Sequence, residues 1–436
     1  MSVVKASNVY KVFGKRQKEV VKRLEEGADR DELTKLGTAA VIDASFEVEA
    51  GEIFVVMGLS GSGKSTLIRT LNGLWAPTTG SVEILGTDIA KIDAAALRKV
   101  RSEHISMVFQ HFALLPHRTV RDNASYALEI RGAEKAERDR VADRWLKDVG
   151  LEGWGDKYPE QLSGGMQQRV GLARALAAET DILLMDEAFS ALDPLIRREM
   201  QEQLVELQRE LKKTIIFITH DLNEAMFLGD RIAVMRNGRI VQVGSPEEIL
   251  TDPANDYVAQ FVHDVDRARV LTASNVMEKA RQIVTNQNGP RVALRNMRES
   301  NASAIYVTDR HRKFLGVVSD RDCIDHLRRG ANTLDEIIKP LATPASPEDL
   351  LIELFLPSSE SPLPVPVTND EGHLVGVVPR ATLLAALGNQ NGDEEQAHDD
   401  TSLEWTAPVD TGLIDQVLAE TDDASEAGAA RGKGEL

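Results

Sequence analysis

One glycine-rich stretch, GLSGSGKST at residues 58–66, constrains this chain more than any other part of its sequence. It lies between an apolar run, residues 53–57, and a helix-forming run, residues 66–71. A strand, a glycine loop and a helix in this order form a phosphate-binding loop, because backbone N–H groups and the helix dipole then face one anion. We expect this loop to hold the phosphates of a nucleotide through Gly58, Ser60, Gly61, Ser62, Gly63, Lys64, Ser65 and Thr66. Within this set, Lys64 would reach the β and γ phosphates and Ser65 would bind Mg²⁺.

Length and charge narrow the class of protein. The 436 residues are enough for two or three domains, and no apolar run approaches the ~20 residues that cross a bilayer. The N-terminus lacks the pattern of a signal peptide, so we expect a cytoplasmic chain whose membrane role comes through a partner. The net charge of −18 argues against nucleic acid as a main ligand. The single cysteine, Cys323, excludes an internal disulfide and is interpreted as an apolar filler.

Three further apolar strands end in polar residues. Residues 105–109 end in Gln110, residues 182–185 in Asp186 and Glu187, and residues 214–219 in His220. A buried carboxylate is costly without a partner, so Asp186 suggests Mg²⁺, and Glu187 is then placed to orient or deprotonate an attacking water. Gln110 could contact Mg²⁺ or that water through its amide. His220 is interpreted as a contact to the γ-phosphate, although a lone histidine is more often structural.

A second set of small residues, Ser163, Gly164 and Gly165, precedes an amphipathic helix within residues 162–176. Small residues ahead of a helix N-terminus form a second anion site. One loop cannot easily hold both sides of the same γ-phosphate, so we expect two chains head to tail, each covering the other's nucleotide. Asp193, at the end of the sequence SALD, would line that subunit contact.

Two segments of the chain are expected to lie outside the nucleotide-binding core. Residues 15–37 are expected to form an exterior insert with two short helices, the second opened by a capping box of Asp29 and Glu32, and residues 111–165 a helical subdomain. Tyr10 precedes the phosphate loop, where its ring would either stack on a purine or pack under the sheet. The sequence leaves both alternatives open.

In their order and spacing, these motifs resemble the ATP-binding subunit of ABC transporters over residues 1–265. LSGGM, with Met166 where many members have glutamine, the run ILLMDEAFSALDPLIR and the helical insert resemble the glycine betaine/proline betaine importer branch. The resemblance implies an α/β P-loop NTPase with a helical subdomain, with ATP and Mg²⁺ as cofactors. It assigns catalysis to Lys64, Gln110, Glu187 and His220, and the metal to Ser65, Gln110 and Asp186.

The same resemblance implies partners. Two copies would form a homodimer that closes over two ATP, bound peripherally to an integral membrane permease at the cytoplasmic face of the inner membrane. A separate binding protein would carry the solute, which the sequence does not identify. A choline, carnitine or other amino-acid-derived solute importer is the alternative within the family, and a soluble ABC ATPase not coupled to transport is the alternative of another class.

Residues 270–388 hold a repeat. FLGVVSDRD and LVGVVPRAT lie about sixty residues apart, each after an apolar strand and before a helix. The pair resembles a tandem CBS module, in which Ser319 and Asp322 of the first repeat would hold an adenine nucleotide, whereas the second repeat has Pro379 and Thr382. The alternatives are a structural pair or one that responds to ionic strength. Residues 389–436, with thirteen acidic and two basic side chains, are expected to be a disordered tail.

Overall fold

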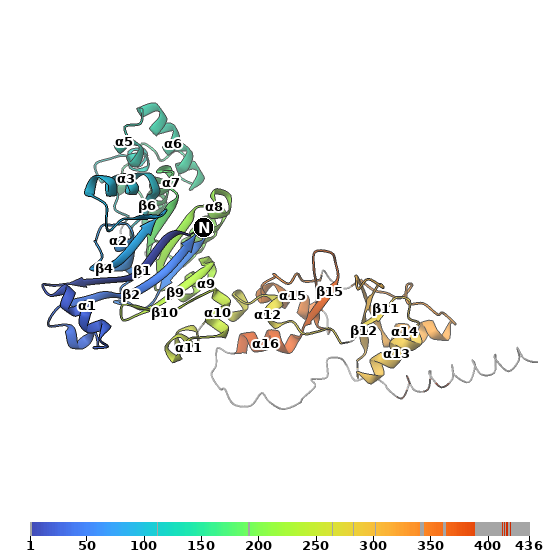
Figure 1. The fold of residues 1–436 in the computed structure, drawn as a ribbon. Coiled ribbons are helices and arrows are strands. Elements are labelled where there is room, and N and C mark those ends of the chain that lie inside the picture. Colours follow the sequence, from blue (N-terminus) through green and yellow to red (C-terminus); the bar gives the residue numbers. More distant parts are fainter. Residues whose placement is uncertain are drawn as a thin grey trace, which may run out of the picture. The chain divides into compact units, whose positions relative to one another are not determined.

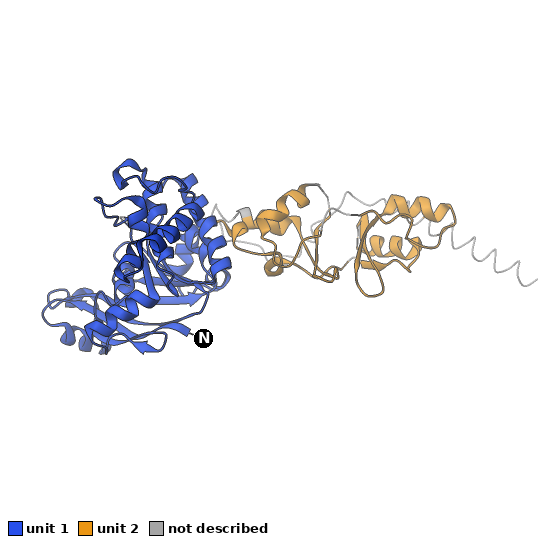
Figure 2. Ribbon diagram, turned by 90° about the horizontal axis from the view of Figure 1, so that it is seen from above, with its two compact units in different colours: residues 1–265 blue, residues 266–436 orange. Residues whose placement is uncertain are grey.

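The computed structural model describes residues 2–388 except 111, 191, 264, 282, 301, 341–343 and 361–362, together with Gly412, Ile414, Gln416 and Ala419. The expected disordered tail therefore lies outside the described residues apart from these four positions. The chain forms two compact units, residues 1–265 and 266–436, which Figure 2 shows in two colours.

A six-stranded sheet forms the centre of the first unit. Its strands are, in spatial order, β10 (Arg239–Gly244), β9 (Arg231–Arg236), β3 (Ile53–Met57), β8 (Thr214–Thr219), β7 (Ile182–Asp186) and β6 (Ile105–Val108). All neighbours are parallel except β10, which forms an antiparallel hairpin with β9. Strands β3, β7 and β8 are buried along their whole length, as expected for the centre of a parallel sheet covered on both faces.

A second sheet is antiparallel, in the order β2 (Thr38–Glu49), β1 (Ser2–Phe13), β4 (Thr79–Ile84) and β5 (Thr87–Asp88). One hydrophobic core joins it to the central sheet, with Phe46 and Phe54 stacked at 5.0 Å between ring centroids. The insert carries α1 (Gln17–Glu25) and one 3₁₀ turn, η1 (Asp31–Leu33). The prediction of a second capped helix in the insert is wrong. The Asp29 carboxylate accepts a hydrogen bond from the Asp31 N–H, and only the three-residue 3₁₀ turn η1 follows, without a side-chain cap.

The first unit contains further helices outside the insert. They are α2 (Lys64–Leu71), α3 (Ala94–His104), α4 (Val120–Ala124), α5 (Tyr126–Ile130), α6 (Lys135–Asp148), η2 (Pro159–Gln161), α7 (Gly164–Ala177), α8 (Pro194–Leu211), α9 (Leu222–Leu228), α10 (Pro246–Thr251) and α11 (Asp256–Val262). Helices α5 and α6 lie at one end of the unit and the insert helix α1 at the other (Figure 1). Helix α7 contacts α4, α5, α6 and β6, so the helical subdomain is tied to the sheet edge that carries Gln110.

The second unit contains the two repeats. The first has β12 (Ala304–Thr308), β13 (Phe314–Ser319) and α14 (Asp320–Arg328), and the second β14 (Val365–Thr368), β15 (Leu374–Val378) and α16 (Arg380–Gly388). Each hairpin is irregular at the same place, after Val307 and after Val367. The other elements are η3 (Arg267–Arg269), α12 (Ala273–Val276), β11 (Ile283–Thr285), α13 (Pro290–Glu299) and α15 (Leu351–Glu360). Both predicted β-β-α units are therefore present.

Two residues of the second unit belong to the hydrophobic core of its first repeat. Cys323 is fully buried in the core beneath α13 and α14, and burial raises the pKa of its thiol to about 12, so it packs as an apolar side chain. Ile414, from the acidic tail, is 1% exposed and belongs to the same core. Within the described residues, every helix is too short or too polar to cross a bilayer.

Candidate functional site

The glycine loop connects the buried strand β3 to helix α2, as the sequence predicts. Gly63 precedes the helix with φ +104°, and a Cβ there would lie 2.1 Å from the Ala40 carbonyl oxygen. Gly58 is equally confined, since a Cβ would lie 2.2 Å from the Met235 carbonyl oxygen. At Gly61, with φ +80°, a Cβ would meet nothing within 4 Å. The loop is thus clamped at both ends and open in the middle, as a phosphate cradle requires.

Lys64 lies at the first position of α2 with its side chain 4% exposed. Its Nζ donates to the carbonyl oxygens of Gly58 at 2.7 Å and Leu59 at 3.3 Å, so the lysine curls back over the loop. Burial lowers the pKa of Lys64, and the carboxylates of Glu187 and Asp186 partly oppose that shift. A buried cation held only by carbonyls and a carboxylate 3.9 Å away is well placed to receive a phosphate oxygen.

Asp186, at the end of β7, is almost fully buried and accepts a hydrogen bond of 3.0 Å from the Ser65 hydroxyl. Burial raises the pKa of Asp186, and the Ser65 hydroxyl and the Arg69 guanidinium 3.8 Å away only partly offset it. No group of three or more acidic, histidine or cysteine side chains gathers as a metal site within the described residues. One carboxylate beside one hydroxyl fits Mg²⁺, which usually takes few protein ligands and completes its shell with phosphates and water.

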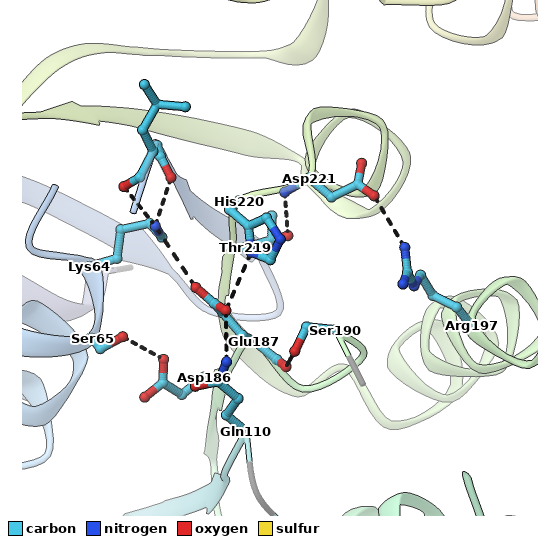
Figure 3. A network of polar contacts seen from close by, with 12 residues as sticks. Lys64, Ser65, Gln110, Asp186, Glu187, Ser190, Arg197, Thr219, His220 and Asp221 are labelled. Carbon is cyan, nitrogen blue, oxygen red and sulfur yellow. Dashed lines mark hydrogen bonds and ion pairs between the residues drawn. The ribbon is translucent and has the colours of Figure 1, made fainter. Parts of the chain in front are cut away.

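Glu187 follows β7, and Figure 3 shows its side chain with Lys64, Gln110 and His220 around it. Its backbone has φ +45°, and its carboxylate Oε2 accepts a hydrogen bond of 3.0 Å from Gln110 Nε2. The Nδ1 atom of His220 lies 3.3 Å from the same oxygen, and Lys64 Nζ lies 3.9 Å from Oε1. A non-glycine residue with positive φ is rare and persists where the surrounding structure fixes it. The residues predicted for catalysis therefore lie together around one carboxylate.

Ser163, Gly164 and Gly165 form a different site. The Ser163 hydroxyl accepts from the Met166 N–H and caps α7, and the Asp193 carboxylate accepts from the Ile196 N–H and caps α8. All four predicted residues line one open pocket of about 560 Å³. No residue of the phosphate loop lines it. Within one chain, the two predicted anion sites thus remain separate.

The Tyr10 ring packs inside the unit and is not exposed for stacking on a purine. Its side chain is 6% exposed and packs with Val20, Val21 and Leu24 of the insert, so it offers no face for a purine to stack on. Burial raises the pKa of its hydroxyl. Phe13, which the sequence motifs do not single out, is 36% exposed at the end of the same strand and packs edge-on against Trp75 at 5.1 Å. Its place at a strand end, ahead of a glycine, is the signal that could have identified it.

The predicted residues of the first repeat already have partners. The Ser319 hydroxyl accepts from the Asp322 N–H and donates to Asp322 Oδ2 at 2.6 Å, and Lys339 Nζ lies 2.6 Å from the same oxygen. Burial alone would raise the pKa of Asp322, but the hydrogen bonds from Lys339 and Ser319 outweigh it and lower the pKa. A ligand that uses this carboxylate must displace Lys339.

These observations agree with the comparisons to known proteins. The profile of the ABC transporter family matches residues 41–190, and that of the CBS domain matches residues 273–329. A glycine betaine/carnitine transport ATP-binding protein of Listeria monocytogenes is 48% identical over 393 residues, covering 89% of this chain and 99% of that protein. A glycine betaine transport ATP-binding protein of Bacillus subtilis is 48% identical over 412 residues, covering 92% and 97%. A glycine betaine/proline betaine transport system ATP-binding protein of Salmonella typhimurium is 47% identical over 404 residues, covering 89% and 98%.

Proposed function

This chain belongs to the family of ATP-binding subunits of glycine betaine and proline betaine ABC transporters, and on that premise we propose that it hydrolyses ATP to drive import of such a solute. The observation that carries the proposal is that Lys64 and Ser65, which follow β3, meet Asp186 and Glu187 at the end of β7, with Gln110 and His220 against Glu187. Phosphoryl transfer needs positioning and charge stabilisation, and this set supplies both.

Each residue then has a task in hydrolysis. The glycine loop and Lys64 hold the phosphates through backbone N–H groups and one cation, and Phe13 provides an exposed ring for the base. Glu187 takes the proton of the attacking water, while Gln110 and His220 orient its carboxylate and the γ-phosphate. Mg²⁺, held by Ser65 and Asp186 with Gln110 nearby, would neutralise charge on the phosphates.

The complete site needs two chains. In one chain, Ser163, Gly164 and Gly165 open into a pocket without any phosphate-loop residue. Placed head to tail, a second copy brings its α7 N-terminus, with exposed Ser163 and Gly164, against the nucleotide on the first. The arrangement is a closed, two-fold dimer with two equivalent ATP sites.

This chain has a candidate surface on which the membrane permease would dock. A groove between α3, β6, α5 and α7 is lined by apolar and cationic side chains: Ile105, Met107, Tyr126, Ile130, Arg131 and Arg174. Ile130, which is 65% exposed, adds a large apolar side chain to this groove. Docking of a short cytoplasmic helix of the permease in this groove would hold the chain at the cytoplasmic face of the membrane.

The solute itself would be selected elsewhere. A quaternary ammonium is held by an aromatic cage, and aromatic residues make up only 5% of this chain, so the permease and a separate binding protein would select it. The second unit would regulate transport in response to ionic conditions or to a nucleotide at Ser319 and Asp322. The Listeria monocytogenes relative is a carnitine as well as a glycine betaine transport protein, and the Salmonella typhimurium relative a glycine betaine and proline betaine one.

Uptake by cells tests the proposal. Cells lacking this chain and cells that carry it receive labelled glycine betaine, proline betaine, carnitine or choline, with and without an osmotic upshift. We expect chain-dependent uptake of a betaine that rises after the upshift. Chain-dependent uptake of choline or carnitine alone would favour the alternative importer, and no chain-dependent uptake of any of them would overturn the proposal.

A further inference from the structure

Arg174 of helix α7 holds the segment that follows Gln110. Its guanidinium donates two hydrogen bonds, from Nη1 to the Ala113 carbonyl oxygen at 2.6 Å and from Nη2 to the Phe112 carbonyl oxygen at 2.9 Å. A planar guanidinium can hold two acceptors in a fixed orientation, which a single ammonium cannot. Arg174 therefore sets the path of the backbone two and three residues after Gln110.

This backbone is in an unfavourable conformation. Phe112 and Ala113 have φ values of +56° and +49°, and neither is glycine. Consecutive left-handed residues with side chains persist only where their surroundings over-determine them. The two hydrogen bonds from Arg174 are such a constraint. If Arg174 moved, the backbone at Phe112 and Ala113 could return to a more favourable conformation.

Helix α7 also contains an unusual buried amide. Gln168 is 1% exposed, yet neither its Nε2 nor its Oε1 has a hydrogen-bond partner among the described residues. Its helical neighbours Gly164 and Gly171 face Phe112, since a Cβ on them would lie 3.9 Å from its ring and 3.8 Å from its carbonyl oxygen. A buried amide without partners is costly, so the packing between this part of α7 and the segment around Phe112 is not optimal for stability.

Arg174 also lines the groove between α3, β6, α5 and α7. One side chain thus contacts both the groove and the segment that carries Gln110, whose amide holds the Glu187 carboxylate. Arg131 lines the same groove and also donates to two backbone carbonyls, those of Ala178 and Ser102. Arg131 makes no hydrogen bond to the described residues of the Gln110 segment, so it is a matched control.

We propose that Arg174 is the positioning residue that transmits permease docking to Gln110, and through Gln110 to the Glu187 carboxylate. The inference rests on the proposed docking of the permease in this groove. A permease helix that shifts the Arg174 guanidinium changes its bonds to Phe112 and Ala113, and the Gln110 amide moves with them. Arg174 then acts through another residue and touches no part of the substrate.

A double-mutant cycle on the full chain, reconstituted with its permease, tests this. The variants are Arg174→Lys, Gln110→Ala, Arg131→Lys and the combinations of each arginine variant with Gln110→Ala. The measured quantity is the stimulation ratio, the ATPase rate of the complex divided by that of the isolated chain, with the KM for ATP, co-purification with the permease and Tm recorded for each. Lysine retains the charge but lacks the planar fork that holds both carbonyl oxygens in a fixed orientation.

We expect Arg174→Lys to lower the stimulation ratio at least about tenfold while the KM for ATP and co-purification stay within about twofold. Added to Gln110→Ala, it should lower the ratio no further, because both changes break one route. Arg131→Lys should leave the ratio within about twofold in either background. These outcomes would support the relay.

Three outcomes would overturn it. The first is that Arg174→Lys and Gln110→Ala lower the stimulation ratio multiplicatively. The second is that Arg131→Lys lowers the ratio as much as Arg174→Lys does. The third is that the Arg174→Lys defect is caused by lost permease binding or lost thermal stability. If the permease does not stimulate the wild-type chain at all, the proposed function fails together with the relay. Normal wild-type stimulation with multiplicative effects would overturn the relay alone.

Discussion

The side-chain amide of Gln110 donates a hydrogen bond of 3.0 Å to Oε2 of Glu187. The two residues follow adjacent parallel strands, β6 and β7, and His220 reaches the same oxygen from the end of β8. The carboxylate that would activate water is therefore oriented by residues from both neighbouring strands. Changes in any of the three should affect the chemical step more than the binding of ATP.

Glu187→Gln should lower the kcat for ATP hydrolysis about 100-fold or more while the KM for ATP changes little. The amide retains the shape of the carboxylate, and its oxygen can still accept from Gln110, but it cannot take the proton, and general-base catalysis contributes roughly 10²–10⁴ in rate. The variant should also accumulate as an ATP-bound dimer in size-exclusion chromatography. Glu202→Gln, on the exposed face of α8, is the control. Near wild-type turnover of the Glu187 variant would remove this residue from its role.

Asp186→Asn should abolish Mg²⁺-dependent hydrolysis and raise the Tm of the nucleotide-free chain at neutral pH. Burial raises the pKa of Asp186 in the folded chain, so its charge destabilises the fold above that pKa; the penalty declines as pH falls below the folded pKa and is lost near the ordinary carboxyl pKa of the unfolded chain. Melting curves of both proteins from about pH 8 to about pH 4 should converge at the acid end. A variant that is less stable than wild type at neutral pH would contradict the assignment.

Phe13→Ala should weaken ATP binding by about 1–3 kcal/mol, the usual value of one base stacked on an aromatic ring. Tyr10→Phe retains the buried ring and should leave the ATP affinity unchanged. Titration with a fluorescent ATP analogue measures both. Equal affinities of wild type and Phe13→Ala would place the base elsewhere.

Sequence patterns were sufficient for the strands that carry the site. Apolar runs at 53–57 and 214–219 became β3 and β8 with the predicted bounds, and their ends hold the phosphate loop and His220. The α/β P-loop fold with a CBS module is confirmed. Strand ends of one parallel sheet meet at one edge, so the order of apolar runs and polar residues along the chain is enough to predict that these side chains gather there.

Other features depend on geometry that spacing does not encode. Strand β1 is irregular between Val9 and Val12, so alternation could not decide whether Tyr10 or Phe13 faces outward. Arg174 binds backbone carbonyls about sixty residues away, which leaves no pattern of side-chain types. Ile414 packs into a core from within the acidic tail, whose composition predicts disorder although residues 413–418 form a short apolar island that could dock.

The first repeat of the second unit should bind an adenine nucleotide or a cyclic dinucleotide more tightly in Lys339→Ala than in wild type. Lys339 occupies the Asp322 oxygen that a ribose would use. Isothermal titration of the full chain in a Lys64→Ala background, which disables the ATP site, measures this binding, and Asp322→Ala is the control. No heat from any of these ligands with either protein would leave the repeat a structural element.

Each ATP site is proposed to be built from two chains, and a mixture of two inactive variants tests this sharing. Lys64→Ala disables the phosphate loop, and Gly164→Asp adds a negative charge at the exposed start of α7, where an acidic residue favours the helix but repels a phosphate. Each variant alone should lack ATPase activity. Mixed in equal amounts, they should recover about a quarter of the wild-type rate, because half of the dimers then contain one intact site. Mixtures as inactive as the separate variants would contradict the shared site.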